Sequence, residues 1–145
     1  MSDRRRIRLA LRNQLLTVSG LPAARAWTNV EHTPVQGQAF IAESFSQDTA
    51  HLRTLTAGGV IEATGMYAIQ WYGVADTASQ SIDDGVAAIL AAFPPGLALP
   101  LSDGTSVRVR GDIAPFAGEI LPTGDGWAVC TVKVFWRREA LLPAA

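Results

Sequence analysis

The chain has 145 residues, of which 48% are apolar and 17% charged, and its formal net charge is −1. This composition excludes a disordered chain, and the near-neutral charge excludes a global basic field that would attract nucleic acid. A chain of this length typically forms one domain, so we expect a single domain over residues 1–145, with residues 1–2 and 138–145 as flexible tails.

The single cysteine, Cys130, excludes an internal disulfide framework and a cysteine-rich metal site. No apolar run approaches the ~20 residues that a membrane span needs, and the basic start is not followed by the apolar segment of a signal peptide. We therefore expect a protein made in a reducing cytoplasm, without a membrane partner.

Charge is distributed unevenly along the chain. Residues 1–60 hold seven arginines against four acidic residues, whereas residues 61–145 hold five basic residues against nine acidic ones. Such a difference fits head-to-tail or ring contacts between unlike surfaces of neighbouring subunits, although chance alone also produces differences of this size.

The first predicted element is an amphipathic helix over residues 3–18. Apolar residues recur there at helical spacing: Ile7, Leu11, Leu15 and Val18. Ser2 or Asp3 is placed to cap its start, and a glycine and a proline follow its end.

Strand-like segments follow this helix. An irregular connection containing Trp27 is expected over residues 20–36, and then a first strand over residues 37–46. Residues 47–59 are largely polar and contain His51 and Arg53, so we interpret them as a loop or as a protruding hairpin arm. β-branched and aromatic residues return over residues 60–74 and predict a second long strand.

A second helix is predicted up to Pro94, with Asp76 or Thr77 as its cap and Asp83 and Asp84 near its start, where the helix dipole favours acids. The remaining chain is β-rich, with strands expected over residues 97–101, 106–110, 113–121 and 127–136. Because strands and helices do not alternate regularly, the order predicts an α+β fold with a mainly antiparallel sheet.

The last predicted strand, residues 127–136, is mostly apolar on both faces. In an antiparallel sheet with helices on one side, the other side is usually solvated. Two apolar faces therefore indicate a buried central strand, or a sheet that a second subunit covers, and the two interpretations are compatible.

Few residues suggest chemistry. His32 and His51 lie in predicted loops at no metal-binding spacing, and Cys130 lies in an apolar strand, where a thiol behaves as a buried hydrophobe. The pair Asp83-Asp84 needs no metal to explain it. We therefore predict no enzymatic activity, no catalytic or metal-binding residue and no cofactor, although scattered carboxylates leave a hydrolase open.

The only basic cluster includes Arg4, Arg5 and Arg8 in the first helix. These arginines have two interpretations: they contact phosphates of a nucleic acid, or they form a solvated helix face that pairs with acids of a neighbouring subunit.

Five segments carry a joint pattern: Trp27-Thr28-Asn29, Pro34-x-x-Gly37-x-x-Phe40-Ile41, Gly65-x-Tyr67-x-Ile69-Gln70-Trp71, Ile82-x-x-Gly85-Val86-x-x-Ile89-Leu90-x-x-Phe93-Pro94-x-Gly96 and Trp127-x-Val129-x-Thr131-Val132-x-Val134-x-Trp136. In order, spacing and total length they resemble the tail terminator family of long-tailed phages, which are minor tail proteins. The resemblance extends from the first helix to Arg137.

The resemblance implies a mixed β-sheet with two helices packed on it, and a structural virion protein at the tail-neck junction. Members form a hexameric ring that ends tail-tube polymerisation and joins the tail to the head-side connector. The implied partners are further copies of the chain, the tail tube protein, the connector protein and, without base readout, phage DNA passing through the lumen.

Candidate contact residues follow from the pattern and the implied ring. Candidate contacts with a neighbouring subunit or the tube are Trp27, His51, Arg53 and Trp136, and candidate DNA-facing residues are Arg4, Arg5 and Arg8. Trp136 is equally compatible with a place in the core. The alternatives are another virion component, such as a tube or head-tail joining protein, a small ligand-binding domain or enzyme, or a nucleic-acid-binding regulator.

Overall fold

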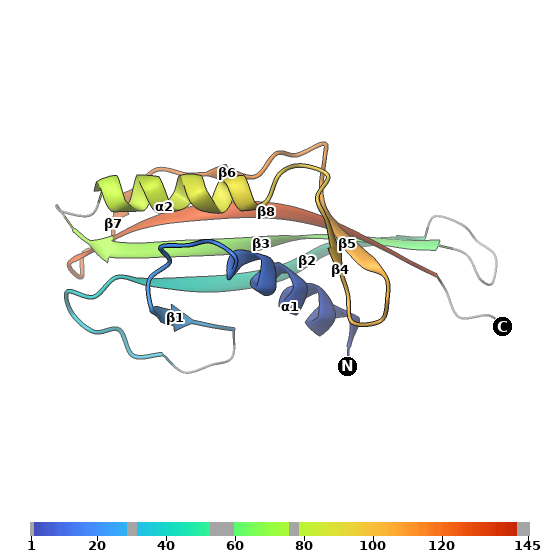
Figure 1. Ribbon diagram of the computed structural model, residues 1–145, viewed down its shortest axis with the longest axis horizontal. Helices are drawn as coiled ribbons and strands as arrows, with labels where there is room; N and C mark the ends of the chain where they lie inside the picture. Colours follow the sequence, from blue (N-terminus) through green and yellow to red (C-terminus); the bar gives the residue numbers. More distant parts are fainter. Residues whose placement is uncertain (1, 29–31, 53–59, 76–78, 142–145) are drawn as a thin grey trace.

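A computed structural model describes residues 2–28, 32–52, 60–75 and 79–141, which form two helices and one eight-stranded sheet (Figure 1). In chain order the elements are α1 (Asp3–Leu15), β1 (Ala24–Ala26), β2 (Phe40–Leu52), β3 (Val60–Val74), α2 (Ser79–Ala92), β4 (Ala98–Pro100), β5 (Ser106–Val109), β6 (Phe116–Ala117), β7 (Leu121–Pro122) and β8 (Trp127–Leu141). The predicted α+β class is confirmed.

The sheet is built around three long strands in the order β2-β3-β8, with β1 beyond β2 and with β5 and β4 beyond β8. The pairing of β1 with β2 is parallel, and every other strand pairing of the described residues is antiparallel. Strand β3 pairs with β8 over its whole length, while β7, β6 and β5 follow one another along the opposite edge of β8.

Both helices pack on the same face of this sheet, because one core contains the apolar stripe of each. Helix α1 contributes Ile7, Leu11 and Leu15, and α2 contributes Ile82, Val86, Ile89 and Phe93. On this face of β3 and β8 the buried residues recur at every second position, as the pleat requires: Tyr67, Ile69, Trp71, Val132, Val134 and Trp136.

Two glycines allow tryptophans of this core to lie close to the backbone. A Cβ atom on Gly85 of α2 would lie 2.3 Å from the Trp71 ring, and one on Gly65 of β3 would lie 2.4 Å from the Trp136 ring. Any larger side chain at either position would therefore displace a ring or the element that carries it.

Most predicted elements are present, with different ends. Helix α1 ends at Leu15 rather than at residue 18, and its cap is Ser2, whose Oγ accepts from the Arg5 N–H at 3.2 Å. Strand β3 has the predicted bounds, whereas the three-residue strand β1 was expected as irregular chain. Asp76 and Thr77 lie outside the described residues.

The segment interpreted as a loop or hairpin arm is a hairpin as far as the structure describes it. Strand β2 continues to Leu52, and residues 47–52 pair with residues 61–65 of β3. The hydroxyls of Thr49 and Thr64 lie 2.5 Å apart and join the two strands further.

The prediction of a flexible tail over residues 138–145 is wrong for residues 138–141. Strand β8 continues to Leu141, and residues 137–141 pair with residues 60–64 of β3. Arg138 is only 4% exposed and donates to Asp3 at 3.0 Å and to Asp103 at 3.3 Å. These ion pairs join the end of the strand to the start of α1 and to the connection between β4 and β5, so the segment is held in place rather than free.

Candidate assembly surfaces

The sheet face that points away from the helices is open and carries a shallow groove of about 420 Å³. The groove is lined from β3 and β8 by alternating residues that include Met66, Ala68, Val129 and Lys133. At its margin Phe116 of β6 and Leu121 of β7 are 46% and 55% exposed. Large apolar side chains that gather on an open face typically mark a contact with another protein.

Aromatic and cationic contacts order the margin of this groove. The Phe116 ring stacks on Phe135 with 6.0 Å between centroids, and the Lys133 ammonium lies 5.8 Å from the Phe116 centroid. Phe116 is thus positioned by its neighbours while almost half of its surface remains in solvent.

One face of β8 is covered by the helices, and the other belongs to the open face of the sheet. The even-numbered positions from Cys130 to Trp136 are buried beneath the helices, and positions 129, 131, 133 and 135 are half-buried on the open face. One end of the open face is covered by an aromatic cluster, in which Phe40 stacks on Tyr72 at 4.5 Å and meets Trp127 edge-on at 5.3 Å.

A buried ionic cluster joins α1 to the sheet. Arg12 of α1 donates from Nε and Nη2 to Glu43 of β2, whose carboxylate also accepts from the Tyr67 hydroxyl at 2.5 Å and from the Thr28 N–H at 3.1 Å. The Glu43 side chain is 0% exposed and that of Arg12 is 17% exposed. The guanidinium lies 4.7 Å from the centroid of the Trp27 ring.

The hydrogen bonds of this cluster decide its protonation. Burial alone would raise the pKa of Glu43, but the hydrogen bonds from Arg12, Tyr67 and Thr28 outweigh burial, so the pKa is lowered. The hydrogen bond to Glu43 raises the pKa of Arg12, and burial with the charge of Glu43 raises the pKa of Tyr67. The cluster therefore holds one negative and one positive charge and acts as an internal tie between α1, β2 and β3.

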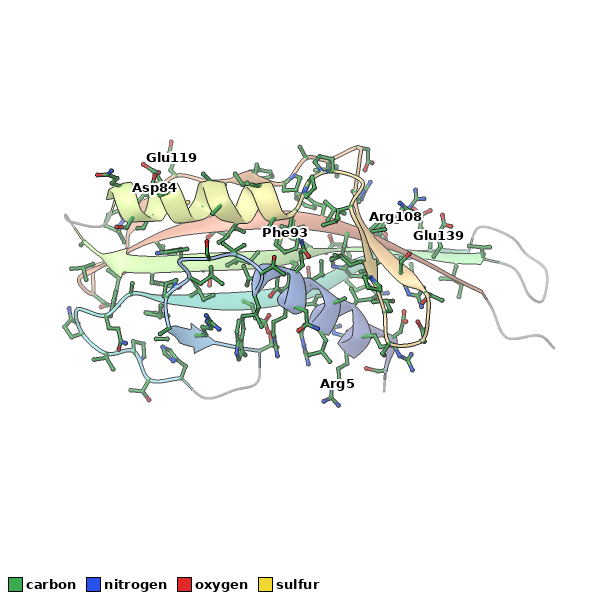
Figure 2. The ribbon with its side chains drawn as sticks, in the orientation of Figure 1. Arg5, Asp84, Phe93, Arg108, Glu119 and Glu139 are labelled. Carbon is green, nitrogen blue, oxygen red and sulfur yellow. The ribbon has the colours of Figure 1, made fainter. Side chains whose placement is uncertain are left out.

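The predicted arginine cluster is divided by the fold. Arg4 lies with its guanidinium 5.4 Å from the Phe45 centroid, and Arg8 is half-buried, whereas Arg5 projects away from the sheet (Figure 2). Arg5 forms no ion pair with any residue that the structure describes. A DNA-facing role for the three arginines stays a prediction.

Trp136 does not form the surface anchor that its strand position suggested. It is 0% exposed, its ring stacks on Phe45 at 5.3 Å, and it fills the space that Gly65 leaves open. The prediction of a subunit contact at Trp136 is therefore wrong, because its side chain is enclosed by its own chain.

The other predicted contact residues have different positions. Trp27 is half-buried beneath Arg12 and packs against the core. His51 lies in β2 opposite Glu62, in the outer part of the hairpin, and Arg53 lies outside the described residues. Contacts of His51 and Arg53 with a partner stay predictions.

No reactive constellation is brought together by the described part of the fold. It contains no group of three or more His, Cys, Asp or Glu side chains that could hold a metal ion, and no described helix is long and apolar enough to cross a membrane. Cys130 is buried and donates from Sγ to the Gly118 carbonyl at 3.3 Å. Burial raises the pKa of this thiol, which makes it a poor nucleophile.

Four residues that organise these surfaces were missed from the sequence: Glu43, Phe116, Leu121 and Arg138. A signal existed for Glu43, since it alternates with the apolar Ile41 and Phe45 and is the one acid on that side of the strand. None existed for Arg138, because its partners Asp3 and Asp103 are distant in the sequence.

Comparison with known proteins agrees with this architecture. A family model described as phage tail terminator protein matches residues 6–136, and no curated protein matches the chain. A solved structure that is 21% identical superimposes with a TM-score of 0.70, over 94% of this chain and 95% of that chain, which shows a shared fold. Because the family match extends over most of its length, the chain belongs to the phage tail terminator protein family and is a structural component of a bacteriophage tail.

Proposed function

We propose that this chain forms the ring that ends polymerisation of the tail tube and joins the tail to the head-side connector. The chain belongs to the tail terminator family. The observation that carries the proposal is its open sheet face, at whose margin Phe116 and Leu121 remain about half exposed. Apolar side chains left in water add no stabilising free energy to a monomer, whereas a neighbouring subunit that buried them would be held by the hydrophobic effect.

Ring formation requires a contact between two unlike surfaces whose rotation closes. The two long edges of the sheet supply unlike surfaces, since the β2 edge is flanked by α1 and the β8 edge by α2 and the short strands β6 and β7 (Figure 1). A closed ring of this kind, with six copies as the family resemblance implies, would present one end to the tube and the other to the connector.

The hairpin of β2 and β3 supports a contact with the tube. Its paired ends extend beyond both helices (Figure 1), and Thr49 and Thr64 join them across the strands. We assign this hairpin to the tube because a projecting, largely polar arm reaches a partner without occupying the edges that close a ring.

The proposal is tested by the assembly state of the purified chain. Negative-stain images and native mass spectrometry should show discrete rings of one copy number, about as wide as a tail tube. Addition of these rings to the polymerising tube protein of the same phage should stop elongation and give shorter tubes. Open fibres of the chain alone would instead indicate a tube protein, and monomers at high concentration would contradict a ring.

A further inference from the structure

Unpaired charge is segregated to opposite edges of the molecule. Arg5 projects from the α1 edge, whereas Asp84 of α2 and Glu119 beyond β6 project from the opposite edge (Figure 2). Asp83, the neighbour of Asp84, is exposed as well. None of these three acids forms an ion pair with a described residue, and α2 carries no basic residue.

Many other charged side chains are satisfied inside the chain, so the segregation is not a general feature of its surface. Among the described residues the ion pairs are Arg12 with Glu43, Arg138 with Asp3 and Asp103, Arg6 with Asp103, Arg110 with Asp112, and Arg137 with Glu139. Arg5, Asp84 and Glu119 are exposed and form no ion pair with a described residue, so their charges are available to a partner.

Apolar side chains accompany the charges at both edges. At the α1 edge, Leu16 follows the last residue of α1 directly and is 41% exposed. At the other edge, Phe116 and Leu121 flank Glu119 in the chain. Exposed apolar residues surrounded by charges are the composition of a protein interface, with a desolvated centre and a polar rim.

We propose that the α1 edge of one subunit docks on the α2 and β6 edge of the next copy, with Arg5 facing Asp84 and Glu119. This inference rests on the proposed ring and names the contact that closes it. The partner is a second copy because each edge has the charge that the other lacks, and because two unlike edges give the head-to-tail contact that a ring needs.

DNA is a less suitable partner for the α1 edge. Binding to duplex DNA depends on several cations that neutralise phosphates together. Here Arg8 is half-buried, Arg6 lies 3.9 Å from Asp103 and Arg12 is paired with Glu43. The exposed arginines of α1 are Arg4, which lies over Phe45, and Arg5, and these are too few cations for a DNA-binding surface.

Charge reversal tests the contact. Arg5→Glu and Asp84→Arg should each raise the subunit concentration needed for half-assembly by about tenfold or more, because an attraction becomes a repulsion. An equimolar mixture of the two variants should form rings again, since every contact between unlike variants has opposite charges. Native mass spectrometry should find the two variants in equal numbers in these mixed rings.

A matched control distinguishes the effect of a charge at this contact from the effect of a change in net charge. Arg108→Glu makes the same change in net charge as Arg5→Glu at another exposed arginine, whose side chain donates a 3.5 Å hydrogen bond to the Gly96 carbonyl, and it should assemble like the unmodified chain. Circular dichroism should show the same fold for all three variants.

The outcomes distinguish this contact from the proposed function. Absence of rings from the unmodified chain would overturn both. Rings that are insensitive to Arg5→Glu and Asp84→Arg, or equally sensitive to Arg108→Glu, would overturn only the contact. Rings of Arg5→Glu that form normally but lose affinity for a duplex oligonucleotide would assign Arg5 to DNA instead.

Discussion

Replacement of Glu43 by glutamine should strongly destabilise the fold. The substitution keeps the size of the side chain and removes its charge, so the Arg12 guanidinium remains in a mostly buried position without a counter-charge. Tyr67 and Thr28 donate to different oxygens of the carboxylate, and the amide keeps only one of them, so one of these two donors also loses its acceptor. The expected loss therefore combines the uncompensated arginine with one lost hydrogen bond.

The size of the effect follows from burial. Removal of one partner of a buried ion pair costs about 3–5 kcal/mol of unfolding free energy. Arg12 keeps 17% of its side chain exposed and lies over the Trp27 ring, so the lower end, about 3 kcal/mol, is expected. At an unfolding entropy of roughly 0.3 kcal/mol/K for a domain of this size, Glu43→Gln should lower Tm by about 10 °C.

Thermal and urea unfolding at one fixed subunit concentration measure this loss. Arg12→Met should also destabilise, but the double variant should lose less than the sum of the single losses, because the two charges then disappear together. Asp112→Asn is the matched control: its pair with Arg110 is exposed, with Asp112 64% exposed, and should leave Tm unchanged. A loss below about 1 kcal/mol for Glu43→Gln, or full additivity in the double variant, would refute the reasoning.

Three further predictions concern the Glu43 cluster, the end of β8 and the packing of α2 on Trp71. Because folding lowers the pKa of Glu43, the stabilisation from its charge is fully present above the unfolded-state pKa of 4.5 and is lost as pH falls through the lower folded-state pKa. The urea midpoint of the unmodified chain should therefore fall toward that of Glu43→Gln in acid. A difference between the two midpoints that does not change with pH would contradict this. Arg138→Met should remove the ion pair with Asp3 and speed amide hydrogen exchange at the end of β8 and the start of α1. Unchanged protection there would show that strand pairing alone holds this end of β8 in place. Gly85→Ala should destabilise by about 1–3 kcal/mol, because the clash with Trp71 exceeds the gain in helix propensity, and a higher Tm would show that the ring moves freely.

The local elements of this protein were predictable because their signals lie within short stretches of sequence. The 3.6-residue period of Ile7, Leu11 and Leu15 predicts α1, and the β-branched and aromatic run predicts β3 with its observed bounds. Such patterns depend on which side of one element faces the core, and the spacing of apolar residues within that element shows which side this is.

Features that join distant segments were not predictable. The sequence placed Trp136 on an apolar strand, but only packing against Phe45 and Gly65 decides that its ring is enclosed. The end of β8 looked like a tail because its charged residues show no strand pattern, whereas Asp3 holds Arg138 in place across 135 positions of sequence.

The sequence by itself indicated the fold class, the family and an apolar surface on both faces of the last strand. The tertiary structure decided where that surface lies, because alternate residues of β8 face opposite sides of the sheet and only the placement of α1 and α2 covers one of them. It also decided which charges are available: Glu43 neutralises Arg12 inside the chain, and Arg5 is left at an edge opposite Asp84. Charge counts along the chain cannot distinguish these two kinds of arginine, because pairing depends on distances that arise only on folding.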